Sequence, residues 1–254
     1  MAERRRIDQL LVARGFFESR ARAQAAIAAG LVRVNGAVAR KPSDSFGDDA
    51  RVEAEQPFPW VSRGGVKLSH ALDAFHVEAA GRLCLDVGSS TGGFTDVLLA
   101  RHAARVIAVD VGRDQMHAKL RGDPRLSLHE QTDIRDLALA SKDRASLAVV
   151  DASFISLTLI IPALASLTAS KAELVALIKP QFEAGRGLAG KRGVVDDDAV
   201  RARAVDNVKA FADKAGWRVT GVIDSPIEGG DGNREYLMHA RKDVGSDSAR
   251  KEPS

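Results

Sequence analysis

The chain has 254 residues, and 45% of them are hydrophobic, so it can bury a sizeable core and fits one ordinary domain together with a small one. Its formal net charge of +3 does not by itself require a nucleic-acid partner. The single cysteine, Cys84, excludes an internal disulfide framework and metal sites built from several cysteines. We therefore expect a globular protein of a reducing compartment, the cytoplasm, and we find no ligand cluster for a metal.

Neither the start of the chain nor its apolar runs indicate export or membrane insertion. Residues 1–6 are basic, but the segment after them mixes apolar and polar residues, unlike a signal peptide. The most apolar region, residues 147–167, is interrupted by Asp151 and Pro162. Because a charge at the centre of a bilayer costs about 2.5 to 3.5 kcal/mol, a buried strand followed by a core-facing helix is the better interpretation.

The first 41 residues carry most of the charge imbalance, with nine Lys or Arg against three Asp or Glu. Apolar residues recur at helical intervals on both sides of Gly15, which predicts two short helices. Asn35 and Gly36 tolerate a positive φ and stand between alternating residues, which predicts a tight hairpin. We expect a helix-helix-hairpin module with positive potential, suited to a polyanion.

Three segments, residues 6–11, 19–23 and 30–36, resemble the RNA-binding module shared by a ribosomal small-subunit protein, pseudouridine synthases and tyrosyl-tRNA synthetases. Guanidinium groups suit bidentate phosphate contacts, although arginines alone more often form a solvated charged face. The resemblance implies RNA binding. The candidate RNA-binding residues are Arg4, Arg6, Arg20, Arg22, Arg33, Lys41 and, beyond this module, Arg63.

The composition also predicts where the parts of the chain meet. We expect an RNA-binding module over residues 1–57, a linker over 58–65, a second domain over 66–242 and a disordered polar tail over 243–254. Phe58 and Trp60 place two aromatic side chains in the linker, where packing is favoured over contact with RNA.

From residue 83 onward, strand-like and helix-like segments alternate, which is typical of a parallel sheet flanked by helices. The expected strands are residues 83–87, 105–109, 126–129, 147–151, 174–178, 218–223 and 235–240. A Gly-rich loop rather than a helix joins the last two, so they should form an antiparallel hairpin. We therefore predict an α/β protein with the Rossmann-like fold of class I methyltransferases, whose sheet has seven mostly parallel strands and an antiparallel C-terminal hairpin, plus a small α+β N-terminal module.

A loop of small residues, D-V-G-S-S-T-G-G-F-T over residues 86–95, follows the first of these strands. Such a loop lets a ligand approach the backbone at the carboxyl end of a strand. Ser90 stands where a dinucleotide fingerprint needs its second glycine, so NAD is disfavoured. Asp110 ends the next strand, where a carboxylate can accept hydrogen bonds from both hydroxyls of a ribose. Asp133 follows the third strand, where it could meet the adenine of a bound nucleoside.

These motifs resemble the S-adenosylmethionine site of class I methyltransferases, most closely the FtsJ/RrmJ type. The resemblance implies that the glycine-rich loop lines the methionine side, Asp110 binds the ribose, and Asp133 and Ile134 meet the adenine. Ser90 departs from the common pattern, which has glycine there. The candidate cofactor residues are Gly88, Ser89, Ser90, Gly92, Gly93, Phe94, Asp110, Val111, Asp133 and Ile134.

Four titratable residues stand where the predicted fold would direct them into the same crevice. Lys67 lies just before the catalytic fold, Asp151 ends the fourth strand, Lys179 ends the fifth, and Glu235 begins the last. Any one lysine is usually a solvated surface charge, but the Lys-Asp-Lys-Glu order resembles the tetrad of ribose 2′-O-methyltransferases.

Transfer of a methyl group from a sulfonium to a ribose hydroxyl needs a base within hydrogen-bond reach of the 2′-oxygen. Lys179 is the expected base. An amine accepts a proton only when it is neutral, a state that desolvation or a second cation favours, and Lys67 can supply that cation. Asp151 and Glu235 are expected to orient the two lysines, and Asp151 should also lie near the cofactor.

Two motifs, V-V-D-A-S-F-I-S-L from residue 149 and L-I-K-P-Q-F-E from residue 177, extend the resemblance. Together with the N-terminal module, they make the chain similar to the TlyA (hemolysin A) family over almost its whole length. The resemblance implies S-adenosylmethionine-dependent 2′-O-methylation of cytidine in ribosomal RNA, with ribosomal subunits or their precursors as the target and no obligate protein partner.

Two alternatives come from other classes of protein. Members of this family have been called hemolysins, so a secreted pore-forming protein is one alternative, and a non-catalytic RNA-binding protein with a decayed Rossmann domain is the other. The interrupted apolar run and the lack of a signal peptide disfavour the first. The intact Lys-Asp-Lys-Glu order disfavours the second.

Overall fold

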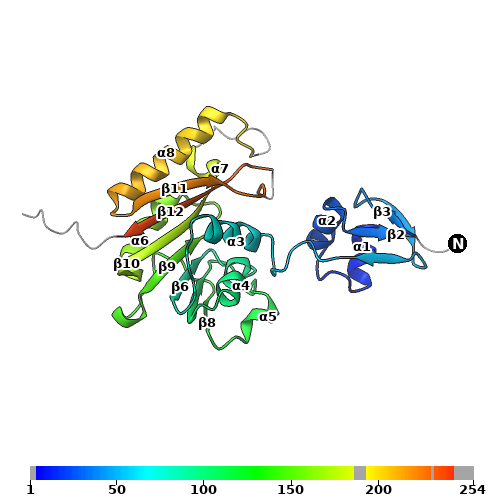
Figure 1. The fold of residues 1–254 in the computed structure, drawn as a ribbon, viewed down its shortest axis with the longest axis horizontal. Helices are drawn as coiled ribbons and strands as arrows, with labels where there is room; N and C mark the ends of the chain where they lie inside the picture. Colours follow the sequence, from blue (N-terminus) through cyan, green and yellow to red (C-terminus); the bar gives the residue numbers. More distant parts are fainter. Residues whose placement is uncertain (1–3, 186–192, 230–231, 243–254) are drawn as a thin grey trace, which may run out of the picture. The chain divides into compact units, whose positions relative to one another are not determined.

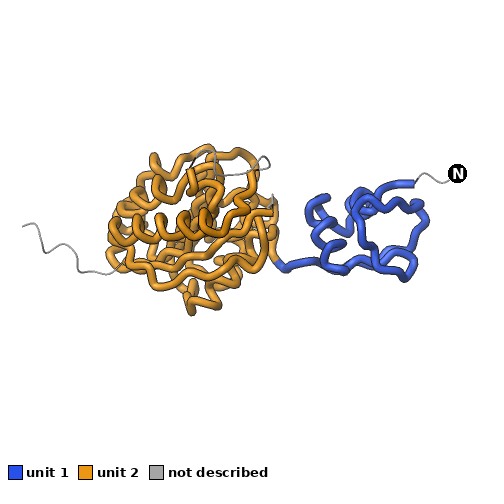
Figure 2. Tube along the Cα trace, turned by 90° about the horizontal axis from the view of Figure 1, so that it is seen from above, with its two compact units in different colours: residues 1–59 blue, residues 60–254 orange. Residues whose placement is uncertain are grey.

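The structure is a computed structural model that describes residues 4–185, 193–229 and 232–242. The chain divides into two compact units, within residues 1–59 and 60–254 (Figure 2). The segment 243–254, expected to be a disordered tail, lies outside the described residues.

The described residues of the first unit form two short helices and five short strands. Figure 1 labels α1, α2, β2 and β3 among them. Strands β2, β3 and β5 form one sheet in the order β3-β2-β5, and β1 pairs with β4. Asn35 and Gly36 have φ angles of 52° and 81°, so the predicted hairpin turn is confirmed, as are the helices on either side of Gly15. The elements are β1 (Arg4–Arg6), α1 (Ile7–Ala13), α2 (Arg20–Ala28), β2 (Val32–Val34), β3 (Ala37–Val38), β4 (Ser45–Gly47) and β5 (Val52–Ala54).

In the second unit, the described residues form a seven-stranded sheet in the order β11-β12-β10-β9-β6-β7-β8. Its strands are β6 (Leu83–Val87), β7 (Arg105–Val109), β8 (Leu126–His129), β9 (Ala145–Val150), β10 (Thr168–Ile178), β11 (Arg218–Asp224) and β12 (Tyr236–Lys242). Its helices are α3 (Gly64–Ala74), α4 (Gly93–Ala100), α5 (Ala118–Arg121), the short η1 (Ser141–Asp143), α6 (Leu157–Leu167), α7 (Pro180–Glu183) and α8 (Asp198–Lys214).

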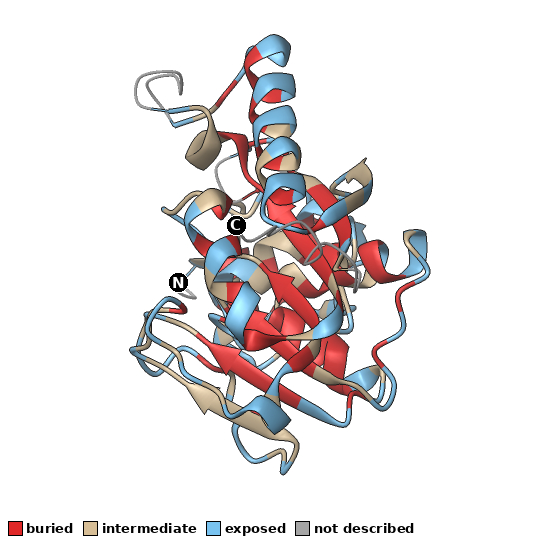
Figure 3. Cartoon of the chain, turned by 90° about the vertical axis from the view of Figure 1, so that its left-hand side faces the viewer, coloured by how far each residue is buried: buried red, intermediate tan, exposed pale blue. Residues whose placement is uncertain are grey.

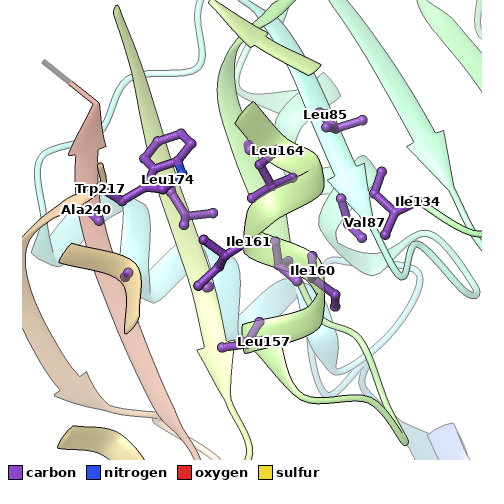
Figure 4. Close-up of a cluster of buried hydrophobic side chains, with 14 of the residues drawn as sticks. Leu85, Val87, Ile134, Leu157, Ile160, Ile161, Leu164, Leu174, Trp217 and Ala240 are labelled. Atoms are coloured by element: carbon purple, nitrogen blue, oxygen red, sulfur yellow. The ribbon is translucent and has the colours of Figure 1, made fainter. Parts of the chain in front are cut away.

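Both faces of this sheet are covered, which explains why its central strands β6, β7 and β9 are mostly apolar and buried. Successive side chains of a strand point to opposite faces, so in β9 Ala148 and Val150 join one core cluster while Leu147 and Val149 join the other. Helices α6 and α8 cover the first face, and α3 and α4 cover the second. Figure 4 shows the apolar side of α6 packed on the sheet beside Trp217, and Figure 3 shows that the central strands are buried.

The strand order creates a crevice at one particular place. Strand β6 pairs in parallel with β7 on one side and with β9 on the other. The chain therefore runs from β6 outward to β8 and returns to the opposite side of β6 at β9. Ligands of such sheets bind outside the carboxyl ends of the strands at this switch point.

The last two strands form the predicted antiparallel hairpin, which joins the sheet through β12, so β12 lies between β10 and β11 and is antiparallel to both. Some details differ from the sequence prediction. Strand β10 begins at Thr168 rather than at residue 174. Glu235 immediately precedes β12 rather than beginning it. Lys67 does not lie before the catalytic fold but inside it, on α3, because this helix packs on the sheet through Leu68 and Leu72.

Among the described residues, no helix has the length and apolar character needed to cross a bilayer.

Strand β6 carries a buried acid beneath the crevice. The side chain of Asp86 is fully buried, and its Oδ2 accepts a 2.6 Å hydrogen bond from the Thr95 hydroxyl. Its Oδ1 has no hydrogen-bond partner among the residues that the structure describes. Burial raises the pKa of Asp86 from 3.8 to about 7, although the hydrogen bond from Thr95 opposes this effect.

This shift predicts how stability depends on pH. Between pH 3.8 and 7 the folded protein holds a proton on Asp86 that the unfolded chain releases, so this residue's contribution to the unfolding free energy declines as the pH rises to 7. The variant Asp86→Asn stays neutral. We expect it to exceed the wild type in unfolding free energy by about 1 to 4 kcal/mol at pH 8, and by less at pH 5. Urea unfolding at both pH values measures the difference; an equal difference at the two would contradict the prediction.

Candidate functional site

Two adjoining cavities occupy the crevice at the carboxyl ends of the parallel strands. The larger cavity, of about 430 Å³, is lined by the loops that follow β6, β7, β8 and β9. The smaller cavity, of about 260 Å³, is lined by the start of α3, the loop after β6, and residues that follow β9 and β10. Gly88, Ser90, Asp151 and Ser153 line both, so the two cavities meet at these four residues.

The first glycine of the loop after β6 is required by the contact that it makes. Gly88 has a φ of 79°, and a Cβ on it would lie 2.6 Å from the backbone carbonyl oxygen of Asp151. Any side chain here would push the loop after β6 away from the loop after β9. The glycine at position 88 is therefore explained by the close approach of two backbone segments at the junction of the cavities.

The carboxylate of Asp110 is held in the larger cavity by two backbone donors. Its Oδ2 accepts a 2.8 Å hydrogen bond from the Ser90 N–H, and its Oδ1 accepts a 2.7 Å hydrogen bond from the Gly112 N–H. Ser90 adopts a φ of 44°, an unusual conformation for a non-glycine residue, and its hydroxyl donates to Gln115. Each oxygen of Asp110 retains accepting capacity, and the side chain cannot turn away without breaking these bonds.

Where the loops after β7 and β8 line the larger cavity, apolar and acidic side chains occur together. Val111 and Ile134 line it, and Val111 is 72% exposed. Asp133 also lines it, but its carboxylate accepts hydrogen bonds from the side chain and the backbone of Arg135. The Arg135 guanidinium lowers the pKa of Asp133 to about 2. Asp133 is therefore ionised and already bonded to Arg135, at the position where the sequence predicts contact with the adenine of the cofactor.

The four predicted titratable residues come together as two ion pairs. Lys67 Nζ lies 2.5 Å from Glu235 Oε2, and Lys179 Nζ lies 2.6 Å from Asp151 Oδ1. Both lysine side chains are nearly buried, with exposed fractions of 10% and 9%. Lys67, Asp151 and Lys179 line the smaller cavity, whereas Glu235 lies behind Lys67.

Sequence reasoning missed a polar residue of this cavity. Lys179 Nζ donates a 2.9 Å hydrogen bond to Ser153 Oγ, and Ser153 lines both cavities. Ser62 also lines the smaller cavity, and its hydroxyl lies where a Cβ on Gly93 would fall. The signal available in the sequence was the position of Ser153, two residues past a strand-end aspartate.

The predicted RNA-binding arginines of the first unit are organised by a buried acid. Asp8 is fully buried, and its carboxylate accepts hydrogen bonds from Arg6, Arg20 and Gln24. Burial alone would raise the pKa of Asp8, but these hydrogen bonds outweigh it and hold the pKa well below its usual value. The side chains of Arg6 and Arg20 remain 43% and 52% exposed, so both present part of their guanidinium group to solvent.

The other predicted RNA-binding residues have more varied surroundings. Arg22 donates to Gln56 and to the Phe58 carbonyl and lies over the Phe58 ring. Arg4 and Arg33 donate to the backbone carbonyls of Ser45 and Gly36. Lys41 is exposed, and Arg63, in the second unit, is exposed and lines the smaller cavity.

This strand order and crevice define a class I methyltransferase. The same fold is found in the S-adenosylmethionine dependent methyltransferase of Mesorhizobium loti, with a TM-score of 0.52 at 15% identity, covering 68% of this chain and 96% of that one. The FtsJ-like methyltransferase family model matches residues 60–242, and the S4 domain model matches residues 5–52.

Close relatives place the chain more narrowly. It is 47% identical to the 16S/23S rRNA (cytidine-2′-O)-methyltransferase TlyA of Mycobacterium tuberculosis, over 95% of this chain and 91% of that one, and 39% identical to Hemolysin A of Brachyspira hyodysenteriae, over 92% and 98%. A structure of a hemolysin candidate from Streptococcus thermophilus has a TM-score of 0.74 at 40% identity and covers 96% of this chain and 90% of that one. The chain belongs to the TlyA (hemolysin A) family of FtsJ-like methyltransferases.

The pair of Lys67 and Glu235 makes a testable contribution to stability. In Lys67→Met the Glu235 carboxylate, which is 3% exposed, would remain without its cation, so we expect the unfolding free energy to fall by about 3 to 5 kcal/mol. The double variant Lys67→Met with Glu235→Gln removes both charges and should recover most of this loss. Chemical unfolding measures all three proteins, and a single variant as stable as the wild type would contradict the buried pair.

Proposed function

We propose that this protein transfers the methyl group of S-adenosylmethionine to the 2′-hydroxyl of a ribose, that of a cytidine in ribosomal RNA. The observation that carries the proposal is the junction of the two cavities at Asp151. A cavity suited to a nucleoside lies on one side of it, and the amine of Lys179 lies on the other.

The residues of the larger cavity fit S-adenosylmethionine. The Asp110 carboxylate, fixed by Ser90 and Gly112, can accept hydrogen bonds from both ribose hydroxyls. Val111 and Ile134 offer apolar surface to the adenine. Ser89 Oγ, at the smaller cavity, is buried and has no hydrogen-bond partner among the described residues, so it is available to the methionine end.

When bound, S-adenosylmethionine supplies an electrophilic methyl group on a sulfonium. The chain's contribution is to bring a ribose oxygen into line with that methyl group and to take the proton from the oxygen. As the oxygen–carbon bond forms and the carbon–sulfur bond breaks, the hydroxyl proton passes to Lys179 Nζ, which later releases it to solvent.

The surroundings of Lys179 hold it in place for this role. Its side chain is nearly buried, as is that of Lys67, and both lysines line the smaller cavity. Glu235 binds Lys67 and holds it in the cavity. Asp151 holds Lys179 beside the junction of the cavities, where the methyl group and the ribose oxygen have to meet.

RNA as the substrate is supported by features of each unit and by the relatives. The S4 unit presents Arg6 and Arg20, which Asp8 orients, and arginines in fixed positions suit phosphate groups. Arg63 is exposed at the smaller cavity, where it can contact the backbone of the target strand. The name of the Mycobacterium tuberculosis relative specifies cytidine 2′-O-methylation of rRNA, which supports the same substrate here.

The role of Lys179 can be tested with a control on the same strand. We expect Lys179→Ala to lower the rate of methyl transfer to ribosomal RNA by at least about 100-fold, because the general base is lost. The binding of S-adenosylmethionine, followed by calorimetry, should change little. Lys171→Ala removes an exposed lysine of β10 and should leave the rate unchanged. A folded Lys179→Ala protein that methylates RNA at the wild-type rate would contradict the proposed mechanism.

A further inference from the structure

We propose that Ser153 is a positioning residue of the methyl-transfer site, whose hydroxyl fixes the direction of the Lys179 amine. The inference rests on the proposed function, because it assigns a role to a neighbour of the proposed base.

Among the described residues, two groups contact the amine of Lys179. Asp151 Oδ1 lies 2.6 Å from Nζ and forms an ion pair with it. Ser153 Oγ lies 2.9 Å from Nζ and accepts a hydrogen bond from the amine. Because a single contact leaves the amine free to rotate about the Cε–Nζ bond, a second contact is needed to fix its direction. Ser153 supplies that second contact.

Direction matters because a neutral amine has one lone pair and two N–H bonds around the same nitrogen. Rotation about the Cε–Nζ bond moves the lone pair among three positions. Donation to Ser153 fixes one N–H, and attraction by the Asp151 carboxylate favours the other N–H on its side. The lone pair is left with the remaining direction, and the proposed reaction requires it to face the ribose oxygen.

The segment that carries Ser153 is fastened at both ends. At its start, the Asp151 N–H donates a 2.9 Å hydrogen bond to the Val87 carbonyl on the neighbouring strand. At its end, the Glu183 carboxylate accepts hydrogen bonds of 2.6 Å from the Ser156 hydroxyl and 2.8 Å from the Leu157 N–H. Glu183 lies on α7, the helix that begins directly after Lys179. The contacts of Glu183 therefore join the segment of Ser153 to the helix that follows Lys179.

The location of Ser153 agrees with a role in transfer rather than in folding. It is exposed, so its side chain adds little to the core. It lines both cavities, and it therefore lies between the expected donor and the expected acceptor of the methyl group.

Steady-state methyl transfer from labelled S-adenosylmethionine to ribosomal subunits purified from a strain that lacks this gene tests the inference. In Ser153→Ala we expect kcat to fall about 10- to 100-fold, as for loss of one hydrogen bond to a reacting group, with KM for both substrates within about twofold of the wild type. Ser153→Thr keeps the hydroxyl and should restore kcat to within about threefold. The matched control is Ser166→Ala, which removes an exposed hydroxyl from α6 and should have no effect.

An unchanged kcat in Ser153→Ala would overturn the inference, and so would a loss confined to KM or a failure of threonine to restore the rate. None of these results would affect the proposed function, which predicts activity in the wild type. Absence of transfer by the wild-type protein would instead contradict the proposed function, and the inference would fall with it.

Discussion

The backbone contact between Gly88 and Asp151 is the constraint on which the site depends. Strands β6 and β9 are paired through Val87 and Val150, and the chain leaves them in opposite directions because the strand order switches there. The two loops can nevertheless touch, since Gly88 has no Cβ to hold them apart. This contact brings the loop after β6, which lines the larger cavity, against the loop that carries Asp151 and Ser153. Residues of both loops line the boundary that the two cavities share.

The electrostatics of the smaller cavity follow from this arrangement. Two lysines and two carboxylates are gathered at the edge of a sheet, largely out of contact with water. Burying an ion pair costs desolvation energy that apolar residues of similar size would avoid, so stability alone does not favour two such pairs. Their place beside a cavity at the carboxyl ends of the strands favours a chemical role instead. The fold supplies the rigid support, because every one of these residues is on or next to a regular element.

Much of the fold could be predicted because it depends on local patterns. The bounds of β6 and β7 follow from short, mostly apolar segments, those of β8 follow from alternating apolar and polar residues, and the loop after β6 follows from its glycines. The convergence of Asp151 and Lys179 follows from their places at the ends of parallel strands. The insertion of β12 between β10 and β11 could not be read from the sequence, since a hairpin can add to a sheet through either of its strands.

What could not be predicted is the choice of partners. The sequence does not reveal that Lys67 binds Glu235 while Lys179 binds Asp151, because residues far apart in the chain are joined by tertiary packing alone. For the same reason it does not indicate that Arg135 occupies the Asp133 carboxylate or that a buried Asp8 holds Arg6 and Arg20. Ser153 could not be predicted because serines are common in loops, and only its short distance from the Lys179 amine distinguishes it.

The central claim is that the two cavities bring a methyl donor to a sugar oxygen rather than to a base. Its most direct test is the identity of the methylated nucleoside. Ribosomal RNA from a strain without this gene would be incubated with the protein and isotopically labelled S-adenosylmethionine, digested to nucleosides and analysed by mass spectrometry. The account predicts that the label resides on the ribose of cytidine, as 2′-O-methylcytidine. Label on a carbon or nitrogen of the base would contradict it.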